Sequence, residues 1–565
     1  MKHLISILGK HQNTLIGMAL GAMIILINIM TVGQHFALSK SIVGTSNKKI
    51  TKNYDLITST VTPPVLVDSI NPITLRLREE LINDPNFKSM ERGRSPLVYG
   101  DFDPSYPGVE MVVPSRFTVH TVFDGFWRDM EIYVFHADGT LMDNWAPKIL
   151  SHEDYPYEYF LEHPLVALAD LDQDNELEMV VNLLHSVFAF NNDGSAISGL
   201  WPKYNITIRP LASHPVIADL DNDGFAEIIE GDGAGLLHIW RYDGQVYSSS
   251  TTTNPWPMVL GEFAQYGHFA NEAPAIGNLD SDPEPEIVFA GQGTNLLYAL
   301  NEDGSALNNN WPVAIASDYG AFTPTLGDVD QDGELEIIVG SRFRIFGNED
   351  HPVKVYVFNT DGSLVNGWPK DIENVGYLRQ VVIADLDLSF PGLELIASPG
   401  TYVSGMSIGT AKTIYAWHYD GTNVSGWPYV VADENHFLAD WSSPVVADFD
   451  NDADLEVVVP MDYTVGGSYG WKLYFIKSDG TDFINSVVFN SKYSRLPTIG
   501  DLDDDGVIDI MLTEQVPWPR TPQYYTSKIM VKKFVGAGSS ILTGGQIAWP
   551  MWGANARRAG EYFAD

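Results

Sequence analysis

The sequence contains no cysteine among its 565 residues. Disulfide bonds, thiolate metal sites and cysteine nucleophiles are therefore excluded, and an exported form of the protein would need another source of rigidity. Basic residues are also scarce, with 33 Lys and Arg against 73 Asp and Glu, which gives a net charge of −40. This balance argues against nucleic acid and anionic lipid as partners and favours cations or basic surfaces.

Charged residues make up only 19% of the chain, whereas hydrophobic residues make up 45%. A disordered polyanion would have far fewer apolar side chains, so the sequence predicts a folded protein despite its acidity.

Long hydrophobic runs are absent apart from one near the N-terminus. Residues 14–32 carry no charge and follow Lys2 and Lys10, and a run of this length serves as the apolar region of a signal peptide or as a membrane anchor. Ala37 and Ser39 have the spacing of a cleavage site, which favours a signal peptide slightly. We expect export to the extracellular space, the cell surface or the periplasm, with anchoring through residues 14–32 as the alternative to cleavage.

The chain is thus divided into three parts. Residues 1–39 are the signal peptide or transmembrane anchor, and residues 40–94 have the polar composition of a linker or stalk. Residues 95–565 contain internal repeats and form the folded body.

An acidic segment followed directly by an apolar strand occurs eight times and defines eight repeat units in chain order. In units one to eight the segment begins at Asp101, Asp170, Asp219, Asn278, Asp328, Asp385, Asp448 and Asp501. A second pattern, an apolar strand ending in Asp-Gly, follows in units one to seven, as in YVFNTDGS at residues 356–363. It predicts a tight hairpin. A Trp-Pro pair follows in most units, with its Trp at positions 201, 256, 311, 368, 427 and 549.

Each unit therefore corresponds to one sheet of four strands, in which the acidic loop joins the first two strands. No helical periodicity separates the units, and a ring of sheets leaves few exposed edges. The predicted fold is all-β, an eight-bladed β-propeller with four-stranded blades, with a seven-bladed propeller as the alternative.

The acidic segments, the Asp-Gly strands and the final WPMWGANARRAG at residues 549–560 resemble the FG-GAP or VCBS repeats of integrin-alpha-like β-propellers. The resemblance covers roughly residues 95–560. It implies a propeller with calcium-binding loops, and the family includes adhesins, lectins, lyases and chaperone-like surface proteins. It therefore indicates the fold more closely than the function.

The acidic loop of unit five has the spacing of a cation site. Asp328, Asp330, Asp332 and Glu336 occupy positions 1, 3, 5 and 9, and Gly333 at position 6 permits a sharp turn. Oxygen ligands that converge on a tight, irregular loop suit Ca²⁺ better than Mg²⁺. The resemblance implies that the backbone carbonyl at position 7 is a further ligand.

Five other units share this spacing, and we predict that they bind several Ca²⁺ ions together with unit five. Unit four begins with an asparagine, which still offers an oxygen but carries less charge. The predicted ligands in these units are Asp170, Asp172, Asp174 and Glu178; Asp219, Asp221, Asp223 and Glu227; Asn278, Asp280, Asp282 and Glu286; Asp448, Asp450, Asp452 and Glu456; and Asp501, Asp503, Asp505 and Asp509.

Units one and six carry a longer loop with a Pro-Gly pair. Their last carboxylates, Glu110 and Glu394, fall at position 10 counted from Asp101 and Asp385. This variant either binds a cation with altered geometry or only makes a rigid turn.

The competing explanation for all the loops is a set of solvated Asx-type turns in which Asp binds the local backbone. Repetition at fixed spacing favours the metal sites. Crowded like charges would otherwise repel, and an ion that binds only the folded loops would stabilise a chain without disulfides.

A partner is expected on the face opposite the acidic loops, because the long and variable segments gather there. Candidate contacts are aromatic and arginine side chains, which stack on sugars or bind carboxylates but equally pack loops or neutralise local acids. They are Trp127, Tyr157, Tyr159, Tyr266, Trp441, Trp518 and Tyr524, with Arg128, Arg342, Arg344, Arg379, Arg495 and Arg520. Histidines 152, 163, 214, 268 and 436 lie between the units and could act as a base.

The leading hypothesis is an exported, calcium-stabilised module that binds or adheres to a glycan or a protein. No nucleophile elbow, zinc-protease helix or phosphate loop occurs, so no catalytic residue is predicted. The alternative is a lyase acting on an acidic polysaccharide, because the Asp-x-Asp-x-x-x-Pro-Gly-x-Glu loops of units one and six resemble those of rhamnogalacturonan lyases. The sequence leaves the oligomeric state open.

Overall fold

The computed structural model describes residues 65–68, 73–74, 87–91, 98–121, 125–142, 145, 148–150, 165–183, 186–204, 213–232, 235–248, 256–260, 273–291, 295–315, 321, 323–341, 353–372, 375, 377–378, 380–400, 413–431, 436–438, 443–465, 468–489, 497–518, 521–535 and 547–549. Every regular element in these ranges is a β-strand. Among the described residues we find no helical candidate for a membrane span. The predicted signal peptide or anchor at residues 14–32 lies outside them.

Each of the eight repeat units forms an antiparallel sheet of four or more strands. Units one to four comprise β4 (Val98–Gly100), β5 (Glu110–Thr121), β6 (Gly125–Phe135) and β7 (Lys148–Leu150); β8 (Leu165–Ala169), β9 (Glu178–Leu183), β10 (Ser186–Phe190) and β11 (Lys203–Tyr204); β12 (Val216–Ala218), β13 (Glu227–Gly231), β14 (Leu236–Trp240) and β15 (Met258–Val259); and β16 (Ala275–Gly277), β17 (Glu286–Gly291), β18 (Leu296–Leu300) and β19 (Val313–Ala314).

The second half of the chain repeats the pattern. Units five to eight comprise β20 (Thr325–Gly327), β21 (Glu336–Gly340), β22 (Val353–Phe358) and β23 (Lys370–Ile372); β25 (Val382–Ala384), β26 (Glu394–Ala397), β28 (Thr413–Trp417) and β29 (Tyr429–Val430); β31 (Val445–Ala447), β32 (Glu456–Val465), β33 (Ser468–Lys477) and β34 (Asp482–Phe489); and β35 (Thr498–Gly500), β36 (Asp509–Trp518), β37 (Thr521–Val535) and β1 (Val65–Asp68).

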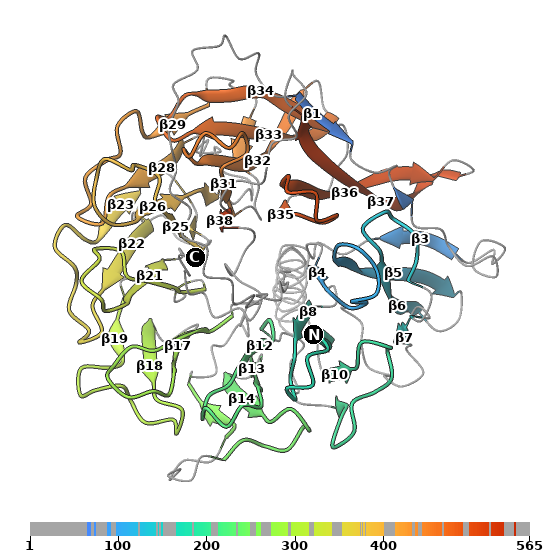
Figure 1. Ribbon diagram of the computed structural model, residues 1–565, viewed down its shortest axis with the longest axis horizontal. Coiled ribbons are helices and arrows are strands. Elements are labelled where there is room, and N and C mark those ends of the chain that lie inside the picture. Colours follow the sequence, from blue (N-terminus) through green and yellow to red (C-terminus); the bar gives the residue numbers. More distant parts are fainter. Residues whose placement is uncertain are drawn as a thin grey trace, which may run out of the picture.

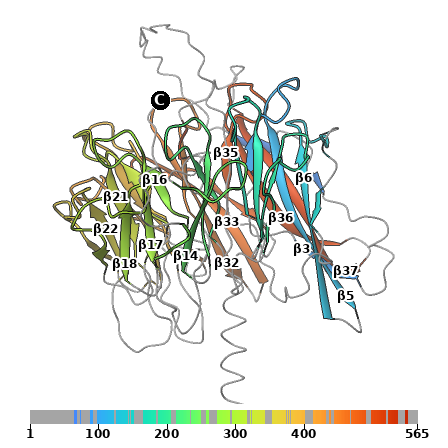
Figure 2. The ribbon, with the colours of Figure 1, turned by 90° about the horizontal axis from the view of Figure 1, so that it is seen from below.

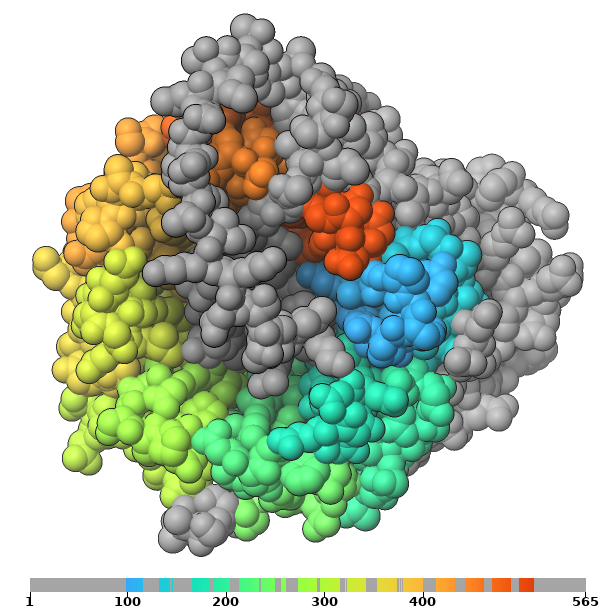
Figure 3. All heavy atoms as spheres, viewed as in Figure 1, coloured from blue at the N-terminus to red at the C-terminus, as the bar shows by residue number. Residues whose placement is uncertain are grey.

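The sheets stand around a common centre, with the first strand of each unit innermost (Figure 1). In the space-filling view the coloured units follow one another around the ring (Figure 3). The all-β class and the propeller of four-stranded blades are therefore confirmed.

Apolar side chains cover both faces of the sheets and are buried between neighbouring units. In β21 all five residues are buried, and β22 is buried at every position except Lys354. Strands buried on both faces read as continuous apolar runs, which explains why the strand after each acidic segment is so hydrophobic. The neighbouring units supply the second face.

The Asp-Gly pairs form the predicted hairpin turns. In unit five the Asn359 N–H donates to the Ser363 carbonyl at 2.8 Å, and Asp361 Oδ1 accepts the Ser363 N–H at 2.8 Å. Gly362 has a φ of 83°, a conformation that costs other residues free energy because of their Cβ.

In four units the tryptophan of the Trp-Pro pair joins its unit to the next one. Trp368 Nε1 donates to the Tyr419 carbonyl at 2.6 Å, at the next Asp-Gly turn. Trp201, Trp311 and Trp427 do the same at 2.7, 2.8 and 2.7 Å. Trp145 of unit one donates to Ile132 of its own sheet instead. The tryptophans therefore set the spacing of successive turns.

The ring closes between units eight and one. The Tyr99 hydroxyl donates to the Ile499 carbonyl at 3.0 Å, and the Val109 N–H donates to the Leu502 carbonyl at 2.9 Å. The outermost strand of unit eight comes from the other end of the chain, because β1 pairs with β37 from Val65↔Val535 to Asp68↔Lys532.

Further strands from residues 40–94, which the sequence assigned to a linker or stalk, also join the sheets. β2 (Ile73–Thr74) pairs with β37, and β3 (Phe87–Glu91) pairs with β5. The sequences of the three N-terminal strands, VLVD, IT and FKSME, show no regular alternation of polar and apolar residues and gave little signal.

Additional short strands accompany the sheets of the later units. β24 (Tyr377–Leu378) pairs with β27 (Pro399–Gly400), and β30 (His436–Leu438) pairs with β32. β38 (Ile547–Trp549) adds a strand beside β31.

Candidate metal sites

All eight acidic loops join the innermost strand of a unit to the second strand, so they occur at one end of the ring. The Asp-Gly turns lie at the same end, as predicted. In unit one Tyr106 of the acidic loop donates its hydroxyl hydrogen to Asp138 of the Asp-Gly turn at 2.8 Å. In unit three Arg241, just before its turn, is paired with Asp223 of the acidic loop.

The last carboxylate of each loop is buried at the start of the second strand and holds the loop closed. In unit five Glu336 Oε2 accepts the Val329 N–H from position 2 at 2.8 Å. The same bond recurs in the other units, formed by Glu178 with Leu171, Glu227 with Leu220, Glu286 with Leu279, Glu456 with Phe449 and Asp509 with Leu502.

The carboxylates at positions 1 and 5 bind the backbone of the turn. Asp328 Oδ2 accepts the Gly333 N–H at 3.1 Å, and Asp332 Oδ1 accepts the Glu334 N–H at 2.9 Å. Asp501 of unit eight accepts the N–H groups of Asp505 and Gly506 at 3.0 and 2.8 Å. The Asx-type turns are therefore present, but each uses only part of the carboxylate oxygens.

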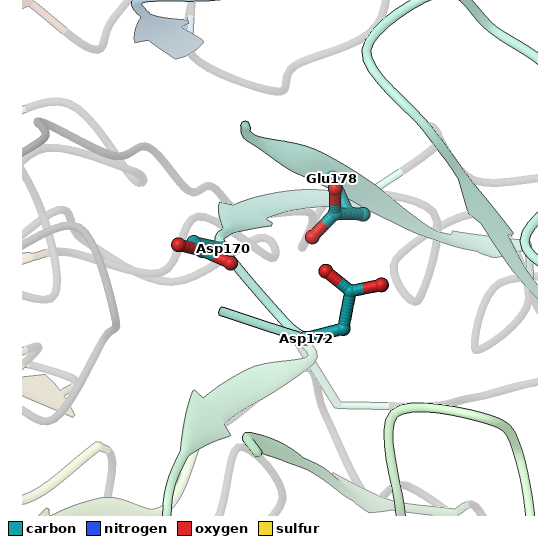
Figure 4. Close-up of side chains that lie close together, drawn as sticks. All are labelled: Asp170, Asp172 and Glu178. Carbon is teal, nitrogen blue, oxygen red and sulfur yellow. The ribbon is translucent and has the colours of Figure 1, made fainter. Parts of the chain in front are cut away.

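The remaining oxygens converge in five of the loops. Three acidic side chains place one oxygen each within 4.8 Å of the others, in the sets Asp170, Asp172 and Glu178; Asp219, Asp221 and Glu227; Asp280, Asp282 and Glu286; Asp328, Asp330 and Asp332; and Asp448, Asp450 and Glu456. Figure 4 shows the carboxylates of the first set facing one another. The structure thus brings together residues from at least five of the six predicted ligand sets, and their role as ligands remains a prediction.

Two of the predicted ligands have roles in shaping the loop. Asn278 Nδ2 donates to the Asp282 carbonyl at 2.5 Å. Asp174 Oδ1 accepts the Glu176 N–H at 2.8 Å and is exposed.

Several converging oxygens are buried and have no hydrogen-bond partner among the residues that the structure describes. They are Asp170 Oδ1, Glu227 Oε1, Asp328 Oδ1, Asp450 Oδ1 and Glu456 Oε1. A buried polar atom without a partner costs free energy. The donor set consists of hard oxygens on a tight loop, which suits Ca²⁺, so the residues present fit the predicted ion.

The electrostatics of the loops support the same conclusion. Burial, with a smaller contribution from neighbouring aspartates, raises the pKa of Glu178, Glu227, Glu286 and Glu336 to about 8 and that of Glu456 to about 9. Burial and Asp452 raise the pKa of Asp450 to about 6. A bound cation would favour the ionised forms and remove this penalty.

The residue across the strand pair from the last carboxylate differs between units, and sequence reasoning did not consider it. In unit seven it lies two positions before the Asp-Gly pair, where Lys477 faces Glu456. In unit eight, which has no Asp-Gly pair, Lys533 faces Asp509. The registers of the other sheets place His136, Asn191, Arg241, Asn301, Asn359 and His418 at this position in units one to six.

The residue at this position determines whether the protein itself places a positive charge beside the carboxylates of the acidic loop. In units two, four and five the asparagine amide is tied to a serine hydroxyl of the turn, as for Asn359 with Ser363 at 2.8 Å. In unit three Arg241 Nη1 lies 3.7 Å from Asp221 in addition to its bond with Asp223. In unit seven the charge of Lys477 offsets part of the rise in the pKa of Asp450. In units two, four and five the residue at this position therefore carries no charge.

Sequence reasoning also missed a buried acid between units two and three. Glu230 is 1% exposed and is bonded to the side-chain amide of Asn182. At the corresponding positions units two, four and five carry Val181, Phe289 and Val339. In the sequence, the acidic residue at a strand position that is apolar in the other units could have indicated this buried acid.

Most of the predicted partner-binding residues lie outside the described residues. Only the strand positions of Trp127, Arg128, Trp518, Tyr524 and His436 are described. His214 is 0% exposed, so its side chain does not reach the surface.

Comparison with known proteins agrees with this fold. A model of the FG-GAP-like repeat matches residues 278–339. None of the curated proteins matches the sequence. Among solved structures the chain is similar to the V. cholerae biofilm matrix protein Bap1, with a TM-score of 0.50 and 11% identity over 88% of this chain and 96% of that chain.

The chain is also similar to BamB from Moraxella catarrhalis, with a TM-score of 0.28 and 12% identity over 66% of this chain and 97% of that chain. At such identities the likeness to Bap1 concerns the fold alone, and the likeness to BamB carries no argument. The repeat match and the ring of four-stranded blades together support an FG-GAP repeat β-propeller.

Proposed function

We propose that the protein is an exported, calcium-stabilised propeller that binds a glycan or a protein with the face opposite its acidic loops. The observation that carries the calcium part is the recurrence of buried, unpartnered carboxylate oxygens at equivalent places in several loops. One such cluster could be a solvated turn, but the clusters recur, and in units two, four and five the residue facing the last carboxylate is an uncharged asparagine, which supports ion binding.

The binding part rests on an asymmetry of the ring. β5, β36 and β37 have 12, 10 and 15 residues, whereas the second strands of units three to six, such as β13, have four to six. The long hairpins belong to neighbouring units eight and one, and their ends extend away from the acidic loops (Figure 2). The two strands of the unit-seven hairpin, β32 and β33, have 10 residues each.

These hairpins bring distant candidate residues to one side of the ring. Trp127 and Arg128 lie near the end of the unit-one hairpin, and Trp518 and Tyr524 lie near the end of the unit-eight hairpin. Tryptophan and tyrosine are suited to stacking on sugar rings and to anchoring protein partners. Bap1, which shares the fold, is a biofilm matrix protein, and a role of the present chain in adhesion is compatible with that likeness.

The lyase alternative depends on the loops of units one and six. There Glu110 and Glu394 bind backbone N–H groups and histidines within the loop, so no described observation favours catalysis over binding.

A glycan array with the protein in calcium tests the proposal, together with incubation on acidic polysaccharides followed by ultraviolet absorbance. Specific binding without unsaturated products supports the binding module, and unsaturated products would replace it with the lyase. A Trp127→Ala, Trp518→Ala double variant should lose binding but keep its calcium content. Calcium that is absent from the folded protein by elemental analysis would refute the calcium part. Cell fractionation tests export.

A further inference from the structure

Units one and six differ from the other units in the partner of their last carboxylate. In unit one His136 Nδ1 lies 3.1 Å from Glu110 Oε1, and in unit six His418 Nδ1 lies 2.9 Å from Glu394 Oε1. A carboxylate only accepts hydrogen bonds, so Nδ1 of each imidazole carries the proton. The same arrangement thus occurs twice in one chain, in units far apart in the sequence.

These bonds fill the oxygens that a cation would use. Glu110 Oε2 already accepts the N–H groups of Phe102 and Asp103 at 2.8 and 3.0 Å. Glu394 Oε2 accepts those of Leu386 and Asp387 at 2.7 and 2.8 Å. In contrast to Glu227 and Glu456, both oxygens of each glutamate are occupied.

The carboxylate at position 3 is also engaged within the loop. Asp103 Oδ1 accepts the N–H and the hydroxyl of Ser105 at 3.0 and 2.5 Å. Asp387 Oδ1 accepts the same groups of Ser389 at 3.0 and 2.6 Å. A serine replaces the aspartate that the ion-type loops carry at position 5, so these loops also have one carboxylate fewer.

The imidazole of unit six lies between the two acids that frame its loop. His418 Nε2 is 3.9 Å from Asp387 Oδ2, on the side of the ring opposite the bond to Glu394. In the other loops a bound ion would lie at the corresponding place, between the carboxylate at position 3 and the last carboxylate of the loop.

The extra residue of the longer loop lets an aromatic ring cover the histidine. Tyr106 stacks on His136 with ring centroids 3.9 Å apart, and Phe390 stacks on His418 at 3.8 Å. The histidines are only 5% and 6% exposed. The aromatic-Pro-Gly sequence and the histidine therefore occur in the same two units because each needs the other.

We propose that in units one and six the imidazoles of His136 and His418 take the place of the divalent cation, so that these two loops hold their shape without metal. This inference rests on the proposed calcium binding of the other loops. Asp385 Oδ1 is buried without a partner among the described residues, but a single oxygen falls far short of the six to eight that Ca²⁺ requires.

The test compares the calcium content of two matched double variants by equilibrium dialysis and elemental analysis. Glu110→Gln with Glu394→Gln should leave the number of bound ions equal to wild type and lower the melting temperature by the same amount in calcium and in EDTA. Glu178→Gln with Glu336→Gln should lower the number of bound ions by two.

A lower calcium content in the Glu110→Gln, Glu394→Gln variant would overturn the inference. If this variant fails to fold, His136→Gln with His418→Gln gives the same reading, because a fall in bound calcium would show that metal binds beside these histidines. Wild-type protein without any bound calcium would refute the proposed function instead, so the two failures are distinguishable.

Discussion

Replacing Glu178 by Gln should change the stability of the protein in opposite directions with and without calcium. Glu178 is 3% exposed, and its Oε2 accepts the Leu171 N–H at 2.6 Å. In the absence of an ion, burial raises its pKa from 4.5 to about 8, and the charges of neighbouring aspartates add to the shift.

The raised pKa makes the metal-free protein less stable as the pH increases. The unfolded carboxyl ionises near pH 4.5, whereas the folded one keeps its proton until about pH 8. The stability that this group contributes is therefore complete below pH 4.5 and is lost as the pH rises toward 8. At pH 7 the loss is about 3 kcal/mol. Glutamine does not titrate and still accepts the Leu171 N–H, so Glu178→Gln should gain up to about 3 kcal/mol in EDTA.

Calcium reverses this order. At a calcium concentration of about 10,000 times the dissociation constant, one site that exists only in the folded protein adds about 5.4 kcal/mol. The variant loses an anionic ligand and with it most of this contribution. For a propeller of this size about 1 kcal/mol corresponds to about 1 °C in melting temperature. Calorimetry at pH 7 should thus show the variant melting about 3 °C above wild type in EDTA and about 2 °C below it in calcium.

The matched control is Glu176→Gln, which removes an exposed charge from the same loop. It should leave both melting temperatures within about 1 °C of wild type, as for most surface substitutions. The reasoning would be refuted if Glu178→Gln destabilised the protein equally in EDTA and calcium, because Glu178 would then serve only as an acceptor within the turn.

Three further predictions concern the propeller itself. Trp368→Phe removes the N–H donated to the next unit at 2.6 Å and should cost about 1–3 kcal/mol by calorimetry, equally with and without calcium; a loss confined to calcium would contradict this. Gly367→Ala forces a Cβ against the backbone of the next unit at a φ of 99°. Its melting temperature should therefore fall far more than that of the control Gly333→Ala. At Gly333 no atom lies within 4 Å of the added Cβ, and the cost is about 1 kcal/mol. Burial raises the pKa of Glu230 well above 4.5, so the stability of the wild type should fall as the pH rises above 4.5; Glu230→Gln should flatten this slope in melts across that range, and an unchanged slope would assign it to other groups.

The recurring local patterns made the fold predictable. Asp-Gly before a polar residue specifies a hairpin through the left-handed glycine and the aspartate cap, and a strand such as Ile337 to Val339 requires burial on both faces. The strands β1 to β3 were missed because their pairing partners lie far away in the sequence, hundreds of residues away for β1. Nothing in a four-residue segment specifies such a partner.

The candidate sites were predictable to the extent that their residues lie on one short loop. Asp328, Asp330 and Asp332 are close in space because the turn is tight. The residue facing the last carboxylate, such as His136 or Asn359, comes from a neighbouring strand, so its effect on the loop depends on the register of the sheet.

The sequence by itself thus determined the repeated sheet, the tight turns and the positions of the acids, because each depends on side chains a few residues apart. Only the tertiary structure decided which loops have a basic side chain beside their last carboxylate, how unit eight is completed by β1, and which long hairpins lie side by side. These features depend on distances across strands and around a closed ring. Such distances are fixed by packing the whole chain, and no local pattern encodes them.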